Sequence, residues 1–262
     1  MMDKLVRTVE REGIVEVVLA NPERRNALSR AMMLELTEAL RAIGGGPSRG
    51  VVLGAEGPVF CSGHDLADCA GADLDAMREL LSLSARLMLT IQSLPQPALA
   101  RVQGLATGAG CQLALTCDLV VASSEAAFRT PGGQGGWFCT TPMVAVARAV
   151  GRKRALEMLM TGDPIDAATA ERWGMINRVV LPEALEAESW DLIRRATRGS
   201  RRSKATGKAA FYAHVDLSDA AAYREATEVM AAASQTPEAQ ERMRAFLEKR
   251  GAVYADGPKD PV

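Results

Sequence analysis

The sequence predicts an α/β fold in which short parallel strands alternate with helices, followed by a helical C-terminal region. Apolar, β-rich runs at 14–19, 51–53, 98–102 and 118–122 are separated by segments with the apolar spacing of helices. Such alternation is typical of a parallel sheet with helices packed on it. Beyond about Gly199 the strand-like runs disappear, and the remaining chain has only helical patterns. We therefore expect one strand-containing core and one helical region after it.

The N-terminal half supplies the first strands and two helices. Asn21-Pro22 ends the first strand, and Ser29 is a suitable N-cap for the helix that follows. The run 44–47, with three glycines and a proline, ends that helix. Its apolar face consists of Met32, Met33, Leu36, Leu40 and Ile43, and that of the second helix consists of Met77, Leu80, Leu81, Ser84, Leu87, Met88 and Ile91.

A glycine-rich stretch at 104–118 comes directly after the predicted strand at 98–102. Three glycines in seven residues are followed by an apolar helix start, so the order is strand, turn and helix. The exposed N–H groups of a helix N-terminus favour negative charge. The glycines are equally compatible with tight packing of a helix against a strand. Further along, 132–136 predicts a long flexible loop, and helices are expected at 202–214, 218–234 and 237–250.

Composition excludes several classes of function. The net charge is −1, with 31 basic and 32 acidic residues, which gives no support for binding to nucleic acid or to a membrane surface. The five cysteines have no CxxC spacing and the chain has two histidines, so neither a disulfide framework nor a zinc site is expected. No window has the length and hydropathy of a membrane span, and residues 1–13 lack an apolar signal core. These features predict a soluble, cytoplasmic protein.

Two glycine-containing turns could form one site. Residues 60–66 and 107–111 each follow a short strand, and if they converge their N–H groups would make an oxyanion hole. Such a site suits a thioester carbonyl that becomes an enolate or a tetrahedral oxyanion.

The motifs around these turns resemble the crotonase, or enoyl-CoA hydratase/isomerase, superfamily. The resemblance covers nearly the whole chain, and its motifs come in the order of the family. They are NPERRNALS at 21–29, GPVFCSGHDL at 57–66, VQGLATGAGCQLALTCDLVVAS at 102–123, FRTPG at 128–132, RALEMLMTGDPIDAATAERWGMINRVV at 154–180 and FLEKR at 246–250.

The resemblance implies a ClpP-like spiral of ββα units over 1–198 and a helical trimerisation region over 199–262. It also implies a homotrimer or a dimer of trimers, a role in fatty acid metabolism, and a coenzyme A thioester as substrate or ligand, with no permanently bound cofactor. His64 and Ala109 match the positions whose backbone N–H groups form the oxyanion hole. The positions that match contacts to coenzyme A are Arg24, Arg25, Ala27, Cys61, Ser62, Gly63, Asp65, Leu66 and Gly108, together with Phe246 and Lys249 for a neighbouring subunit.

The acid–base positions of the family are substituted in this chain. The two glutamates of a hydratase correspond to Gln112 and Gly132, and a third position used by some members corresponds to Thr140. None of these side chains exchanges a proton near neutral pH. Ordinary hydration is therefore not expected. His64 is the candidate for replacing the lost proton transfer, because its pKa range suits it, but its imidazole is better read as pointing away from the site. A binding or regulatory protein, a thioester hydrolase and a decarboxylase-like enzyme remain alternatives, whereas the two histidines form no recognisable serine hydrolase triad.

Overall fold

The computed structural model describes residues 4–254, which form a six-stranded sheet, a smaller second sheet and surrounding helices. The large sheet has the order β1-β2-β3-β5-β7-β10, and all its neighbouring strands are parallel except β1 and β2. The small sheet has the order β4-β6-β8-β9. The strands are β1 (Val6–Arg11), β2 (Ile14–Leu19), β3 (Gly50–Ala55), β4 (Val59–Cys61), β5 (Ala98–Val102), β6 (Leu105–Thr107), β7 (Leu119–Ser123), β8 (Ala127–Arg129), β9 (Ile165–Asp166) and β10 (Arg178–Val180).

The expected spiral of ββα units is present. Successive units are β3–β4–α2, β5–β6–α3 and β7–β8–α4, in which the first strand joins the large sheet and the second joins the small one. The helices of the core are α1 (Arg30–Gly45), α2 (Leu74–Ser93), α3 (Ala109–Thr116), α4 (Pro142–Thr161), α5 (Ala167–Arg172) and α6 (Leu185–Ala196).

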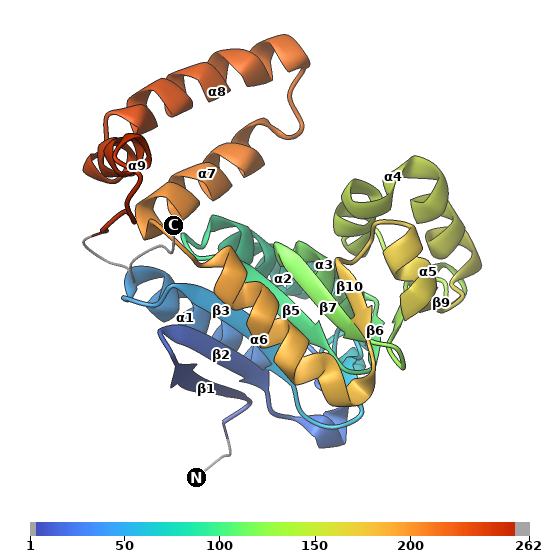
Figure 1. Cartoon of the computed structure of the whole chain (residues 1–262). Coiled ribbons are helices and arrows are strands. Elements are labelled where there is room, and N and C mark those ends of the chain that lie inside the picture. Colours follow the sequence, from blue (N-terminus) through green and yellow to red (C-terminus); the bar gives the residue numbers. More distant parts are fainter. Residues whose placement is uncertain (1–3, 255–262) are drawn as a thin grey trace.

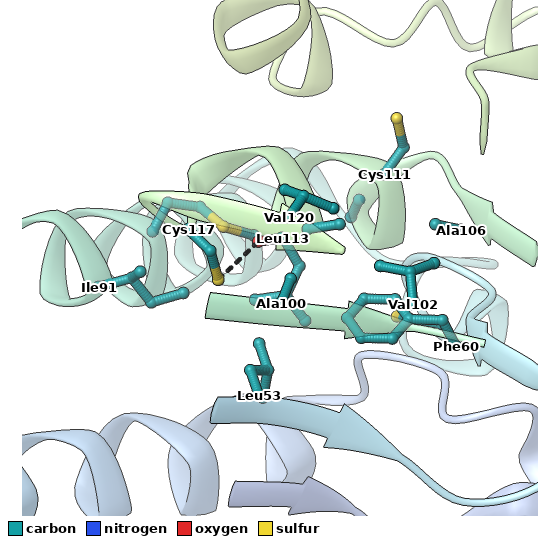
Figure 2. Close-up of a cluster of buried hydrophobic side chains, with 14 of the residues drawn as sticks. Leu53, Phe60, Ile91, Ala100, Val102, Ala106, Cys111, Leu113, Cys117 and Val120 are labelled. Carbon is teal, nitrogen blue, oxygen red and sulfur yellow. Dashed lines mark hydrogen bonds between the residues drawn. The ribbon is translucent and has the colours of Figure 1, made fainter. Parts of the chain in front are cut away.

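The large sheet is buried on both faces, because alternate residues of each strand point to opposite sides. Val52, Leu99 and Val121 pack with Trp190 and Ile193 of α6, which lies across one face of the sheet (Figure 1). On the other face, Leu53, Ala100 and Val120 belong to the main core with residues of α1, α2 and α3. Figure 2 shows these three side chains together with Ile91 and Leu113.

The C-terminal helices extend away from the sheets. They are α7 (Arg201–His214), α8 (Asp219–Ser234) and α9 (Pro237–Leu247), and they form an arm beside the core (Figure 1). No residue of α7 or α8 is fully buried, and Met230 and Phe246 are 78% and 75% exposed. A partner subunit covering this arm, and a domain boundary at 198/199, both stay predictions.

One carboxylate fastens the arm to the core. Asp118, between α3 and β7, accepts hydrogen bonds from the Ala98 N–H at 2.7 Å, from Lys208 Nζ at 2.6 Å and from the Tyr212 hydroxyl at 2.9 Å. Lys208 Nζ also donates to the carbonyls of Ile91 and Gln96, both at 3.0 Å. Burial and the adjacent Asp118 raise the pKa of Tyr212, so its hydroxyl stays a donor.

Most of the expected elements are confirmed, and the misses have local causes. Ser29 caps α1 by accepting a hydrogen bond from the Met32 N–H at 3.1 Å, and no helix of the described residues is long and apolar enough to cross a membrane. Helix α4 was not expected because Gly151, with φ +74°, interrupts its helical pattern. The loop expected at 132–136 is present as a run of turns between β8 and α4, and its flexibility stays a prediction. A short 3₁₀ turn covers Pro131–Gly133, and the N–H groups of Gly135 and Trp137 both donate to the Gly132 carbonyl.

We predict that Lys208→Met destabilises the protein by roughly 3 kcal/mol, the low end for removing one partner of a buried ion pair. The Lys208 side chain is only 9% exposed, so its loss leaves the Asp118 carboxylate uncompensated. The free energy of unfolding is measured by urea denaturation at one fixed protein concentration. The exposed Lys204, on the same helix, provides the control: an equal loss in Lys204→Met would contradict the assigned role of the Asp118 network.

Candidate active site

The two glycine-containing turns meet in the structure. Gly63 has φ +88°, and a Cβ atom there would lie 2.9 Å from the Thr107 carbonyl oxygen and 3.2 Å from the Ala109 nitrogen. A Cβ atom on Gly110 would lie 2.2 Å from the Cys61 carbonyl oxygen. Since real Cβ contacts are longer than this, only glycine permits the approach at either position.

Backbone hydrogen bonds to Leu28 hold the first turn on both sides of His64. The Leu28 N–H donates to the Gly63 carbonyl at 2.7 Å, and the Asp65 N–H donates to the Leu28 carbonyl at 3.3 Å. This parallel bridge uses the residues on either side of His64. The N–H of His64 itself takes no part in this bridge. Ala109 is the first helical residue of α3, and its N–H has no partner within the helix.

A cavity of about 530 Å³ opens beside these two N–H groups. His64, Gly108 and Ala109 form one side of it, and the segment from Pro131 to Pro142 forms another. The remaining lining residues are Ser62, Gly63, Leu66, Leu81 and Thr107. The aromatic pair Trp137 and Phe138 lines the cavity, and so does Leu81, which was expected on the apolar face of the second helix.

His64 is among the residues that line the cavity, but neither nitrogen of its imidazole is accessible from it. Its ring centroid is 6.2 Å from that of Trp137, and both residues line the cavity. Both ring nitrogens are fully buried, and the Leu28 carbonyl is the nearest backbone acceptor to the ring. Burial lowers the pKa of His64, and the Leu28 carbonyl and the Asp68 carboxylate offset this only in part.

The three positions expected to match the family's acid–base residues differ in their access to the cavity and in the room they leave for a side chain. Thr140 and Gly132 line the cavity, whereas Gln112 is 6% exposed and is not among the described lining residues. A Cβ atom on Gly132 would lie 2.1 Å from the Trp137 carbonyl oxygen and 2.8 Å from Cys139 Sγ. Gly132 is thus not a glutamate position with its side chain simply removed, because the backbone itself fills that space.

The cysteines are poor nucleophiles in this environment. All five are free thiols. Burial raises the pKa of Cys111 to about 12 and also raises that of Cys139, whose sulfur accepts a hydrogen bond from the Gly132 N–H at 3.3 Å. The attacking form of cysteine is the thiolate, which is scarce at neutral pH under these conditions.

The residues expected to contact coenzyme A fall into two groups. Ser62, Gly63, Leu66 and Gly108 line the cavity. The others lie outside its wall. Arg24 makes two hydrogen bonds of 2.9 Å to Asp65, Arg25 is exposed nearby, Ala27 and Cys61 are buried, and Phe246 and Lys249 lie at the end of α9.

Asn26 is a residue whose importance the sequence analysis missed. It is fully buried with φ +52°. Its Oδ1 accepts from the Asn21 N–H at 3.0 Å, while its Nδ2 donates to the carbonyls of Glu56 and Val59 at 2.8 and 2.9 Å. These bonds fix the loop whose Arg25 carbonyl accepts from the Ser62 N–H at 3.0 Å. An asparagine following Asn-Pro in a loop was the available signal.

Comparison with known proteins gives the class. The family model described as enoyl-CoA hydratase/isomerase matches residues 9–257, and a solved structure of an enoyl-CoA hydratase from Mycobacterium smegmatis superimposes with a TM-score of 0.93 at 41% identity, covering 96% of this chain and 99% of that one. The chain belongs to the enoyl-CoA hydratase/isomerase, or crotonase, superfamily.

Within the superfamily, the similarity extends to one subgroup. Enoyl-CoA hydratase domain-containing protein 3 of Mus musculus is 43% identical over 256 residues, which cover 96% of this chain and 85% of the mouse protein. The solved structure of the human protein of the same name has a TM-score of 0.92 at 39% identity, covering 95% of this chain and 100% of that chain. The motifs GHDL at 63–66 and ATGAGCQL at 106–113 resemble this subgroup too.

The expected cytoplasmic location is wrong by the same comparison. Vertebrate relatives at 40–43% identity are named as mitochondrial. The expectation rested on the composition of the N-terminal residues. A cellular address is carried by a targeting segment that is separate from the folded domain, so the fold and its composition do not define the compartment.

We predict that Gly110→Ala destabilises the protein by roughly 1–3 kcal/mol, as overpacking typically does. The added methyl group would meet the Cys61 carbonyl and push the two turns apart. Urea denaturation measures the loss. Gly207→Ala is the control, because a Cβ atom on Gly207 of α7 meets nothing within 4 Å and alanine favours a helix by about 0.5–1 kcal/mol. Equal effects in the two variants would contradict the close approach of the turns.

We predict that His64 makes the stability of the protein fall in mild acid. Its pKa is lowered from 6.5 in the folded state, so the unfolded chain takes up the proton first as the pH falls. Between pH 7 and pH 5 the free energy of unfolding of wild type should therefore fall more than that of His64→Gln, by on the order of 1.4 kcal/mol. Denaturation at pH 7 and pH 5 measures the difference, and parallel losses in the two proteins would contradict a buried, neutral imidazole.

Proposed function

We propose that this protein binds acyl-CoA thioesters and polarises the thioester carbonyl through the backbone N–H groups of His64 and Ala109. The close approach of Gly63 to the Gly108–Ala109 backbone is the observation that carries the proposal. His64 and Ala109 both line one mainly apolar cavity, which supports the proposal. Backbone donors held in place contribute about 10²–10³-fold each where negative charge develops on oxygen.

The same cavity argues against ordinary hydration of enoyl-CoA. Hydration adds a hydroxyl to one carbon and a proton to the other, and general acid–base groups contribute roughly 10²–10⁴-fold each. No carboxylate lines the cavity within the described residues. A thioester hydrolase that uses cysteine is disfavoured too, because the thiols of Cys111 and Cys139 are held protonated. The proposed function is therefore acyl-CoA binding with enolate stabilisation.

Two further features complete the proposed complex. The exposed guanidinium of Arg25, on the loop that bonds to Ser62, suits the phosphates of coenzyme A, since guanidinium groups bind phosphate oxygens in pairs. The exposed apolar residues of the C-terminal arm, with Phe246 and Lys249 at its end, suit assembly into a homotrimer or a dimer of trimers.

Ligand-dependent stability tests the proposal. Acetyl-CoA at about 100 times its dissociation constant should raise the free energy of unfolding by roughly 2.7 kcal/mol. Arg25→Ala should lose about tenfold in affinity, equivalent to about 1.4 kcal/mol, for acetyl-CoA but not for the truncated thioester of N-acetylcysteamine. Arg152→Ala, on the exposed part of α4, is the control.

Equilibrium binding and the absorbance of crotonyl-CoA give the decisive readouts. No binding of acetyl-CoA by wild type would overturn the proposal. Loss of the enoyl-thioester absorbance at rates near a typical enzyme kcat of about 10 s⁻¹ would overturn the argument against hydration.

A further inference from the structure

Within the described residues, no permanently charged side chain lines the cavity. The polar side chains on this wall are hydroxyls and one amide, from Ser62, Thr107, Thr140, Thr141 and Gln134. Only His64 and Cys139 can change their protonation. Burial lowers the pKa of the imidazole and raises the pKa of the thiol, so both side chains are neutral near pH 7. A ligand in the cavity therefore meets no positively charged side chain on the described wall.

Two arginines of neighbouring segments are held by partners within the protein. Arg129 donates to the Gly162 carbonyl at 2.5 Å and to Gln134 Oε1 at 2.9 Å. Arg24 makes two hydrogen bonds of 2.9 Å to the Asp65 carboxylate. Neither guanidinium is among the described residues that line the cavity. A carboxylate that entered the cavity would therefore lose part of its hydration without gaining an ion pair.

The apolar part of the wall comes from separate segments of the chain. Leu66 belongs to the 3₁₀ turn after β4, and Leu81 belongs to α2. Trp137 and Phe138 belong to the loop between β8 and α4, and Pro142 begins α4. These side chains give the cavity of about 530 Å³ a mainly apolar lining. Such a lining favours hydrocarbon, because each methylene group that leaves water strengthens binding by up to about fourfold.

We propose that this cavity selects uncharged, apolar acyl groups and rejects acyl groups that end in a carboxylate. The inference rests on the proposed function, since it requires the thioester carbonyl to lie beside His64 and Ala109 with the acyl chain in the same cavity. A chain that ends in methyl groups would lie against Leu81, Trp137 and Phe138 and gain from leaving water. The substrate class is therefore thioesters of apolar monocarboxylic acids, and thioesters of dicarboxylic acids are excluded.

Two ligands of the same shape test the selection by charge. The acyl group of glutaryl-CoA ends in a carboxylate, and that of isoheptanoyl-CoA has two methyl groups in place of the carboxylate oxygens. Isothermal titration calorimetry at pH 7 gives the dissociation constants, at one fixed ionic strength because salt screens charges. Wild type should bind isoheptanoyl-CoA at least about tenfold more tightly than glutaryl-CoA.

Thr140 allows the selection to be reversed. It is an exposed residue that lines the cavity, so Thr140→Lys adds an ammonium group there. This variant should improve the affinity for glutaryl-CoA relative to isoheptanoyl-CoA by about tenfold, as expected for a hydrogen bond to a charged group. The ratio is the readout because coenzyme A is itself anionic, so a new lysine tightens both ligands. Thr140→Met, of similar length but uncharged, is the matched control and should keep the wild-type ratio.

A series of chain lengths tests the apolar wall. Affinity should rise from acetyl-CoA to butanoyl-CoA to hexanoyl-CoA, by up to about fourfold for each methylene group. Leu81→Ala should lose about threefold or more in affinity for hexanoyl-CoA and little for acetyl-CoA, because only the longer chain needs the leucine side chain. Leu89→Ala is the control, since Leu89 lies on the same helix but is 62% exposed and does not line the cavity.

The outcomes separate this inference from the proposed function. If wild type binds glutaryl-CoA as tightly as isoheptanoyl-CoA, or if affinity does not rise with chain length, the selection is overturned while acyl-CoA binding stands. An unchanged ratio in Thr140→Lys would also overturn it, because the end of the acyl chain would then lie elsewhere. If wild type binds none of these thioesters, acetyl-CoA included, the proposed function and this inference fall together. Variants that bind acetyl-CoA at least as tightly as wild type have a folded site.

Discussion

The site depends on a close contact between two pieces of backbone. Gly110, one residue into α3, lies against the carbonyl of Cys61 at the end of β4, and Gly63 lies against the turn that starts the same helix. Any side chain at either position would separate the small sheet from α3. The neighbouring strands β4 and β6 pair just before the two turns. This pairing and the glycine contacts together hold the backbones of His64 and Ala109 near each other. The cavity and its proposed chemistry both depend on that arrangement.

In the proposed function, stabilising the oxygen and transferring a proton require different groups: backbone N–H donors for the first and ionisable side chains for the second. Under the proposed function, backbone donors hold the oxygen, and such donors do not depend on the identity of the side chain. Proton transfer does depend on side chains, and no carboxylate is among the described residues that line the cavity. The imidazole of His64 is the one basic side chain among the described lining residues, and both its nitrogens are buried. The burial that lowers its pKa also keeps it neutral.

Local features of the fold could be predicted from the sequence, while contacts between distant segments could not. Ser29 predicted the start of α1 because a capping side chain bonds to a backbone N–H only three residues further on. The glycine spacing at 104–110 indicated a turn before a helix, although the three-residue strand β6 within it was too short to show a period. The ring contact between His64 and Trp137 joins residues 73 positions apart in the chain, so no local pattern could reveal it. Likewise, the substitution at Gly132 looked like a missing side chain until the Trp137 carbonyl was seen to fill its place.

The crowding at Gly132 also bears on how this cavity could change over evolutionary time. A single substitution there cannot restore a carboxylate, because the first added carbon would collide with main-chain atoms rather than with a side chain that could rotate away. The turn closed by the Gly132 carbonyl would have to be rebuilt before any acidic residue at that position could be tolerated. New side chains can therefore enter this cavity more readily at Thr140, Gln134, Trp137 or Phe138 than at Gly132.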